Sequence, residues 1–197
     1  MNDPNPDEQD SQDMERLASG HDAALNGLME RHAQKLFRYL VRSLQNEEDA
    51  ADLAQETFAK VYQHRTRFDR SQKFSTWLYA IASNLVRDRY RWRSRHPRIS
   101  IDAECDATGR SFQETLPQQG QLPNESLEEE ERAVAVRLAV AALPEELRTP
   151  LILAEYEERS QSEIGAILGC TAKAVETRIY RARQKLRESL GKFLHFV

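Results

Sequence analysis

Hydrophobic residues recur every three or four positions along most of the chain, a period that predicts amphipathic helices and an all-α fold. The repeat begins near residue 13, so we expect one long core helix over 13–44, ending in a turn at 45–46. Further helices are predicted over 47–64 and 74–98. The intervening residues 65–75 show no clear period, and most of them should form a loop.

The second half of the chain carries its own helix signals. Ser126 and Ser160 each begin a Ser-x-x-Glu capping box, and Pro144 suits the first turn of a helix that ends near Tyr156. Gly169 should end the helix that opens at Ser160, and a further helix is expected over 172–190. Two helices joined by a tight glycine-bearing turn form a helix-turn-helix, whose second helix enters a DNA major groove.

The chain length of 197 residues fits two small domains. The expected organisation is an acidic disordered tail over 1–12, a helical domain over 13–97, a flexible acidic linker over 98–125 and a second helical domain over 126–192. Each helical domain is long enough to bury a core of its own.

The formal net charge of −4 hides two basic regions. Residues 60–98 carry a local balance of +9 and residues 173–187 carry +5, whereas 1–15 and 102–131 are strongly acidic. This distribution is typical of two nucleic-acid contacts on one chain. It also predicts that the acidic tail and linker compete with phosphates for the basic regions, so that the free protein binds DNA poorly.

The helix predicted over 74–98 places polar residues beside its apolar stripe. Asn84, Arg87, Arg91 and Arg95 lie three or four positions apart, and Trp77 lies at the edge of the two stripes. An aromatic ring, an amide and a row of guanidinium groups can stack on unpaired bases and hold a phosphate backbone. The alternative is a solvated basic face on an ordinary core helix.

A row of carboxylates follows the helix predicted over 47–64. Asp49, Asp52 and Glu56 fall at the i, i+3, i+7 positions of one face. Asp49 can be explained by the favourable interaction of an acid with a helix start, but Asp52 and Glu56 lie beyond the first turn. Such a row suits a basic protein surface or, as the alternative, a divalent metal with further ligands from another element.

Other function classes find little support in the sequence. No apolar run approaches the roughly 18 residues of a membrane span, and the polar N-terminus does not resemble a secretory signal, so we expect a cytoplasmic protein. Cys105 and Cys170 form no metal-ligand pattern and should be reduced thiols, with a redox switch as the alternative. The histidines are scattered and no catalytic constellation is legible, so neither an enzyme nor a cofactor or metal site is predicted.

Three segments of the first half resemble regions 2.1 to 2.4 of the extracytoplasmic-function sigma factors, the smallest members of the sigma-70 superfamily. They are DAADLAQETFAKVY, RFDRSQKF and STWLYAIASNLVRDRYR. The segment LPEELRTPLILAEYEERSQSEIGAILGCTAKAVETRIYRARQKL is similar to sigma region 4. Together the likeness covers about 13–95 and 126–190, and the absence of recognisable regions 1.1 and 3 fits this small class.

The resemblance implies a bacterial protein that brings core RNA polymerase to promoters and helps to melt the start site. Its acidic helix would dock on the beta-prime coiled coil, with the beta subunit as a further contact, through Asp49, Asp52, Gln55 and Glu56. A base flipped out of the minus-10 element and its strand would be held by Phe68, Asp69, Ser71, Phe74, Trp77, Asn84, Arg87 and Arg91. An anti-sigma factor would cover the polymerase-binding faces.

Sigma region 4 reads the minus-35 element, and the outward residues of the helix over 172–190 would face base edges or phosphates there. They are Lys173, Glu176, Thr177, Tyr180 and Arg181, with Arg178 to the side as a backbone contact. Glu176 stands where other members carry a basic residue, and a Glu accepts a hydrogen bond from a cytosine amino group.

A duplex-binding transcriptional regulator with a sensing or dimerising N-terminal domain is the alternative. A regulator that binds only duplex DNA has no use for Trp77 and Asn84 beside an acidic docking row.

Overall fold

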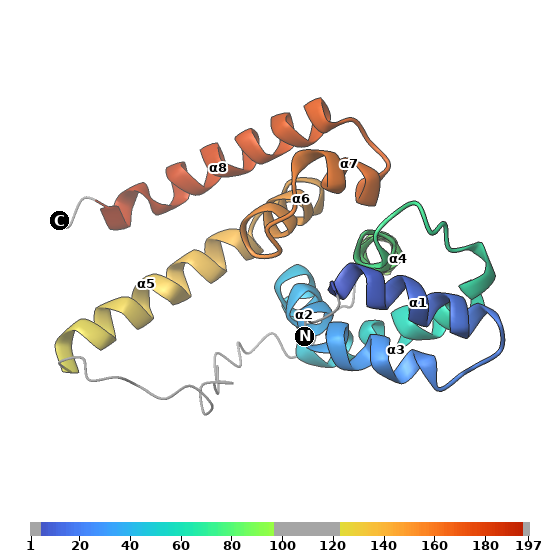
Figure 1. Cartoon of the computed structure of the whole chain (residues 1–197). Coiled ribbons are helices and arrows are strands. Elements are labelled where there is room, and N and C mark those ends of the chain that lie inside the picture. The colour runs from blue at the N-terminus through green and yellow to red at the C-terminus, as the bar shows by residue number, and fades with distance from the viewer. Residues whose placement is uncertain (1–4, 97–122, 195–197) are drawn as a thin grey trace.

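The computed structural model describes residues 5–96 and 123–194, with side chains described over 5–96 and 131–191. Within these ranges the chain forms eight α-helices and one short 3-10 helix (Figure 1). The all-α fold expected from the hydrophobic period is therefore confirmed.

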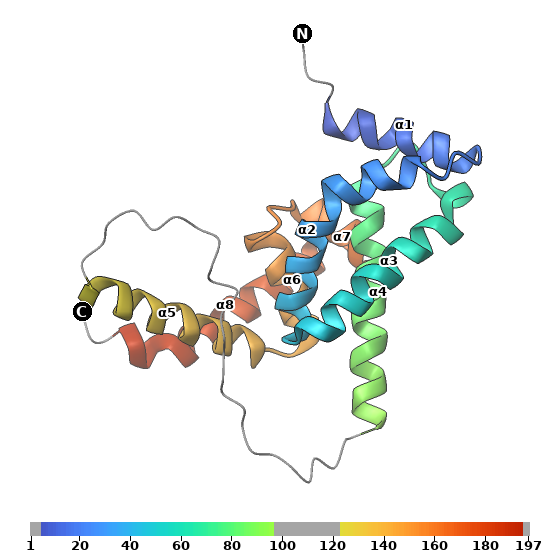
Figure 2. The ribbon, with the colours of Figure 1, turned by 90° about the horizontal axis from the view of Figure 1, so that it is seen from below.

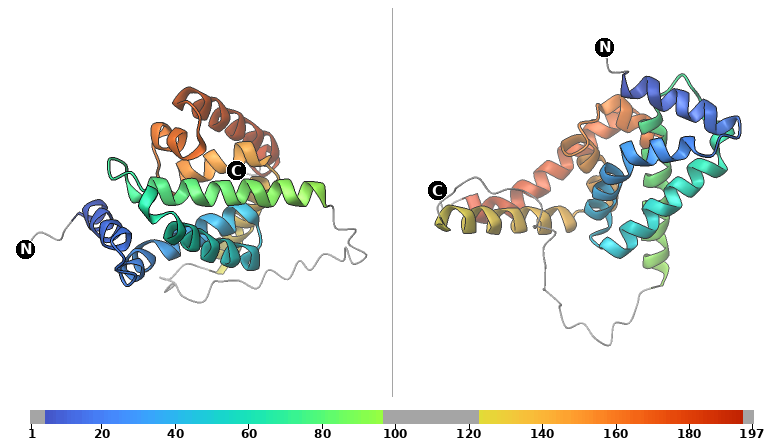
Figure 3. Two further views of the ribbon diagram at one scale, coloured as in Figure 1. Left: turned by 90° about the vertical axis from the view of Figure 1, so that its right-hand side faces the viewer. Right: turned by 60° about the horizontal axis from the view of Figure 1, so that its bottom comes forward.

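The first helical domain contains four α-helices and the 3-10 turn. They are α1 (Pro6–Ala18), α2 (Ala24–Leu44), α3 (Glu47–Gln63), η1 (Arg65–Arg67) and α4 (Phe74–Arg95). The second contains α5 (Pro123–Ala141), α6 (Glu145–Glu155), α7 (Gln161–Leu168) and α8 (Ala172–Leu194). In Figure 3, α4 lies between the other helices of the first domain and the helices of the second.

Local hydrogen bonds set several of the helix boundaries. Asn46 caps α3 by accepting from the backbone N–H of Asp49 at 2.7 Å. The predicted capping box of α7 is complete. The Ser160 side chain accepts from the backbone N–H of Glu163, and the Glu163 side chain accepts from the backbone N–H of Ser160. Gly169 ends this helix with φ +66°. These features confirm the sequence reading of the helix-turn-helix.

The N-terminal prediction was wrong in two respects. Residues 6–12, expected to be disordered, belong to α1, where Asn5 accepts from the N–H of Asp7 and Pro6 takes the first helical position. The single helix expected over 13–44 is interrupted between α1 and α2, where Gly20 adopts φ +92°.

The start of the second domain also differs from the expectation. Helix α5 begins at Pro123, three residues before Ser126, so residues 123–125 are helical and do not belong to a linker. The remaining predicted linker, which includes Cys105, lies outside the described residues.

Ionic contacts hold the acidic helix α1 against α2. Asp10 is 1 % exposed and accepts from Arg31 at 2.8 Å, while its second oxygen lies 2.6 Å from Nε2 of His32. Arg31 also donates to Asp13 at 2.6 Å. Burial alone would raise the pKa of Asp10, but the hydrogen bonds and charges of His32 and Arg31 outweigh it and hold the pKa below 3.8.

We expect Asp10→Asn to lower the free energy of unfolding by about 2 kcal/mol at pH 7, since it removes the charge that Arg31 and His32 face. A depressed pKa stabilises the fold above 3.8, and this contribution is lost as pH falls through the folded-state value. The difference in free energy of unfolding between the wild-type protein and Asp10→Asn should therefore disappear in acid.

Denaturant unfolding at neutral pH and in acid strong enough to protonate Asp10 in the folded protein measures both effects. Asp22→Asn is the matched control, because the Asp22 carboxylate accepts an exposed hydrogen bond from Tyr62 at 3.2 Å. If Asp10→Asn lowers the free energy of unfolding equally at both pH values, ion pairs of Asp10 do not hold α1 against α2.

The two domains share one hydrophobic core. Helix α4 packs against α7 and α6, and α2 packs against α6, as the view in Figure 2 also shows for α2 and α6. Helices α5 and α8 run away from this body together (Figure 1). The core thus joins segments from both halves of the chain.

Candidate nucleic-acid interfaces

The first candidate surface is the polar side of α4. Asn84 and Arg91 are exposed and Arg87 is half-buried. Arg87 donates to the Asn84 side-chain oxygen at 3.4 Å, and Arg91 lies 3.8 Å from Asp88 on the same helix. These contacts are long, so the cationic groups are available to an anionic strand.

Three aromatic rings support the loop that precedes α4. The ring centre of Phe68 lies 5.3 Å from Trp77 and 6.2 Å from Phe74. Trp77 is half-buried, which leaves an edge for a ligand, whereas Phe74 is only 1 % exposed. Phe74, which the sequence analysis names as a DNA contact, therefore has its ring in the core under the loop.

The loop itself is shaped by a local turn. The Asp69 carboxylate accepts from the backbone N–H of Ser71 at 2.9 Å, and this bond, followed by that of the Ser71 hydroxyl, lowers the pKa of Asp69. Both side chains are exposed. The loop thus presents a carboxylate and a hydroxyl to solvent.

Helix α1 flanks this loop, a contact that the sequence did not predict. Glu15 accepts two hydrogen bonds from Arg70 at 2.8 and 2.9 Å, and Asp7 lies 3.3 Å from Lys73. Acidic residues near the N-terminus therefore pair with two cations of the loop.

The carboxylates of α3 differ in their exposure and in their ion pairs. Asp52, Gln55 and Glu56 are exposed, and only Lys60 at 3.6 Å pairs with Glu56 among the described residues. Asp49 is different, because its carboxylate is 20 % exposed and bonds to both Arg89 and Arg93 of α4.

Asp49 therefore ties α3 to the end of α4. A cleft of about 540 Å³ lies at this junction, and exposed Trp92 lines it together with Arg89, Arg93 and Asp52. Over the part of the chain that the structure describes, no group of three or more His, Cys, Asp or Glu side chains could hold a metal ion. The divalent-metal alternative for the acidic row thus gains no support there.

The second candidate surface is the outer face of α8. The side chains of five of its predicted DNA contacts are exposed: Lys173, Glu176, Thr177, Tyr180 and Arg181. Lys173 pairs with Glu176 at 2.9 Å, and Tyr180 is 68 % exposed. Because the opposite side of α8 buries Val175, Ile179 and Ala182, the first five must face away from the core.

Arg178 occupies the flank of α8, as the sequence indicated. It is half-buried and its guanidinium lies 3.8 Å from the Cys170 sulfur in the turn before α8.

The turn between α7 and α8 depends on Gly165. A Cβ built on Gly165 would lie 2.7 Å from the carbonyl oxygen of Cys170, a contact that the backbone must move to relieve. We expect Gly165→Ala to lower the free energy of unfolding by about 1–3 kcal/mol and to weaken binding through α8.

The matched control is Gly191→Ala, since nothing lies within 4 Å of a Cβ built there and alanine favours a helix by about 0.5–1 kcal/mol. Thermal unfolding of both variants measures the contrast. Equal effects of the two substitutions would show that the close approach of Gly165 to the turn is unimportant.

No helix among the described residues combines the length and apolar character needed to cross a membrane.

Comparison with known proteins agrees with this division of the chain. The family Sigma-70 region 2 matches residues 28–96, and Sigma-70, region 4 matches residues 126–186. The ECF RNA polymerase sigma factor SigW of Bacillus subtilis is 34 % identical over 90 % of this chain and 94 % of its own length. The RNA polymerase sigma-H factor of Pseudomonas aeruginosa is 32 % identical over 95 % of this chain and 96 % of its own length.

A solved structure is similar over both domains. CnrH, in complex with the cytosolic domain of CnrY, has a TM-score of 0.66 and 28 % identity, covering 93 % of this chain and 98 % of CnrH.

Proposed function

The chain belongs to the extracytoplasmic-function group of the sigma-70 family, and we propose that its α4 and α8 surfaces read separate promoter elements while α3 docks on the polymerase. It is a sigma factor, a non-enzymatic protein that directs RNA polymerase to promoters. The observation that carries the proposal is the pair of exposed polar surfaces on different domains, with uncovered carboxylates on α3.

The α4 surface suits the opened minus-10 element. A base can be read on its hydrogen-bonding edge only after it leaves the stack, and it then needs a pocket beside a cationic channel. Trp77, Asp69 and Ser71 offer the wall of such a pocket, and Asn84 offers an amide. Arg87 and Arg91 would hold the strand, with Phe68 and Phe74 supporting the loop from within.

The α8 surface suits duplex DNA at the minus-35 element. Lys173, Thr177 and Arg181 lie along one exposed helix face, as expected for a recognition helix in the major groove. Glu176 and Tyr180 complete that face, and Glu176 would favour a cytosine amino group once released from Lys173. Arg178 would contact the phosphate backbone from the side.

The α3 surface suits the beta-prime subunit. Asp52, Gln55 and Glu56 are exposed and would face a basic protein surface, with the beta subunit as a further contact of the chain. Asp49 would act by orienting Arg89 and Arg93, because those two cations already engage its carboxylate.

An anti-sigma factor is proposed as the partner that keeps the protein inactive. The likeness to CnrH, whose structure contains the cytosolic domain of a second protein, supports a partner that covers the sigma fold. The bacterial cytoplasm, where core polymerase works, is the proposed location.

Run-off transcription with purified core polymerase and a genomic promoter pool tests the proposal. New transcripts should appear only when this protein is added. Specific DNA binding without polymerase, and no new transcript, would instead favour a duplex-binding regulator.

A further inference from the structure

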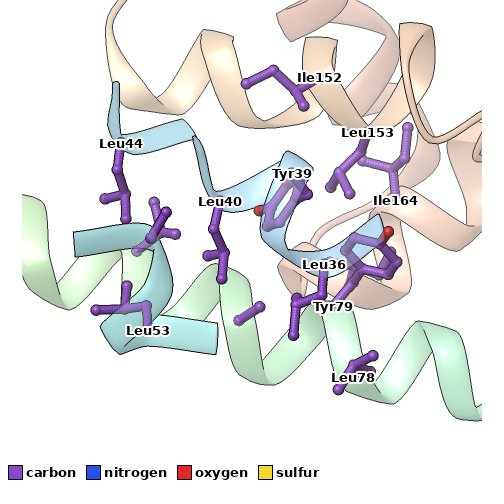
Figure 4. Packing of buried hydrophobic residues seen from close by; sticks show 14 of the residues in the cluster. Leu36, Tyr39, Leu40, Leu44, Leu53, Leu78, Tyr79, Ile152, Leu153 and Ile164 are labelled. Carbon is purple, nitrogen blue, oxygen red and sulfur yellow. The ribbon is translucent and has the colours of Figure 1, made fainter. Parts of the chain in front are cut away.

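The loop between η1 and α4 is held by packing at both of its ends. At its start, the ring centre of Phe68 lies 5.3 Å from that of Trp77, and at its end Phe74 is buried. Helix α4 is fixed beyond the loop, because Leu78 and Tyr79 belong to the buried cluster that Figure 4 shows. The residues between these two ends form the exposed turn that is proposed to read the minus-10 base.

This turn, residues 69–72, has one contact with another helix. The Asp69 carboxylate accepts from the backbone N–H of Ser71, which is a bond within the turn. Arg70 differs, because its guanidinium donates to both oxygens of the Glu15 carboxylate of α1, at 2.8 and 2.9 Å. Among the residues that the structure describes, no other side chain of the turn bonds to another helix.

The pair of Arg70 and Glu15 fixes an orientation as well as a position. A guanidinium that donates to both oxygens of one carboxylate is held in a defined plane. The other cation of the loop is held less closely, since the Lys73 ammonium lies 3.3 Å from Asp7 and 3.8 Å from Glu163. The arginine contact is therefore the one that can set the conformation of the turn.

Helix α1 is a firm anchor for this contact. Met14 and Leu17, close to Glu15 in the sequence, are buried in the core, and Asp10 accepts from Arg31 of α2. Helix α1 also packs against η1 and α4. The Glu15 carboxylate is thus fixed relative to the helices at both ends of the loop.

The same pair determines which charge the loop offers to DNA. A phosphate contact from an arginine raises affinity for every sequence, whereas contacts with base edges discriminate between sequences. The Arg70 side chain is 58 % exposed, so its fork could bind a phosphate if Glu15 did not occupy it. While Glu15 holds Arg70, the turn presents the carboxylate of Asp69 and the hydroxyl of Ser71.

From these contacts, and resting on the function proposed above, we infer that Glu15 is a specificity-determining residue for the minus-10 element. It is a positioning residue, which acts through Arg70 on the turn that carries Asp69 and Ser71. It also withholds the Arg70 guanidinium from the phosphates of unrelated sequences. Helix α1 thereby takes part in the choice of promoter without contacting the base itself.

Strand discrimination by the holoenzyme tests this role. Glu15→Gln keeps the size of the side chain and removes the charge that holds Arg70. The variant is assembled with core polymerase and titrated with non-template single strands from a promoter found by run-off transcription. We expect the affinity ratio between the matched strand and one with a changed minus-10 base to fall about fivefold, the most that an exposed ion pair usually contributes.

Salt dependence is a second readout, which a simple loss of stability would not move. In Glu15→Gln the released Arg70 should gain a phosphate contact, so a random-sequence single strand should bind more tightly. The logarithmic dependence of this affinity on salt concentration should steepen by about 0.7. Adding Arg70→Gln should abolish both increases while discrimination stays low, and reversing the pair with Glu15→Arg and Arg70→Glu should recover most of the discrimination.

Glu8→Gln is the matched control, because it removes an exposed carboxylate of α1 that forms no ion pair within the described residues. It should leave both readouts unchanged. Wild-type discrimination and salt dependence in Glu15→Gln would overturn the inference and leave the proposed function standing. A wild-type holoenzyme that cannot distinguish the two strands would instead defeat the proposed reading of the minus-10 element, and the inference with it.

Discussion

Replacing Asp52 and Glu56 together by arginine is expected to weaken assembly with core RNA polymerase at least about 100-fold. Both side chains are exposed on α3, so the change should leave the core intact. It converts two attractive charges facing a basic surface into repulsive ones, and like-charge contacts across an interface cost several kcal/mol. Titration of labelled protein with core polymerase at fixed salt measures the loss.

Two control variants separate docking from general effects of charge and stability. Glu30→Arg reverses an exposed carboxylate on α2 and should bind polymerase normally. Asp49→Asn should chiefly lower stability, because its carboxylate pairs with Arg89 and Arg93. Normal polymerase binding by the doubly reversed protein would remove α3 from the docking surface.

The features that the sequence predicted well are those encoded within a few residues. The α7 capping box and the Gly169 end depend on hydrogen bonds between neighbours three to five positions apart, so the local pattern is sufficient. The exposed face of α8 followed in the same way from the buried positions Val175, Ile179 and Ala182.

The features that were missed depend on partners distant in sequence. Asp49 looked like part of an acidic row, but its cations lie 40 and 44 positions away on α4. Asp10 looked like part of a polar tail, and only the packing of α2 brings Arg31 and His32 to it. A local signal for α1 was nevertheless present, since Asn5 followed by Pro6 is typical of a helix start.

The contact between the domains was the least predictable feature. Arg148 of α6 donates to the Ser43 carbonyl, 105 positions away in the sequence. Nothing in the residues around Arg148 indicates that its side chain is buried against the first domain. Periodicity identifies which face of a helix is apolar but not which domain covers it. The sequence therefore predicted two separate polar surfaces, whereas the cleft that Arg87 and Arg91 of α4 share with Arg178 of α8 emerged only from the structure.

Asn84→Ala combined with Arg91→Ala is expected to reduce run-off transcription about 100-fold. Both side chains are exposed on α4, so their removal costs little packing. The amide would lose contact with a base edge and the guanidinium contact with the strand, each about 1–3 kcal/mol for a well-formed interaction. Fluorescence of a 2-aminopurine in the minus-10 element would measure the accompanying loss of promoter opening.

The defect should lie in strand opening, because α8 and the α3 docking face are unchanged. A template already unpaired at the minus-10 element should therefore restore most of the transcription, since the cost of unstacking has been removed. Gln34→Ala with Arg38→Ala removes an exposed amide and guanidinium from α2 and should transcribe normally. If the unpaired template gives no rescue, Asn84 and Arg91 act at a step other than capture of the opened strand.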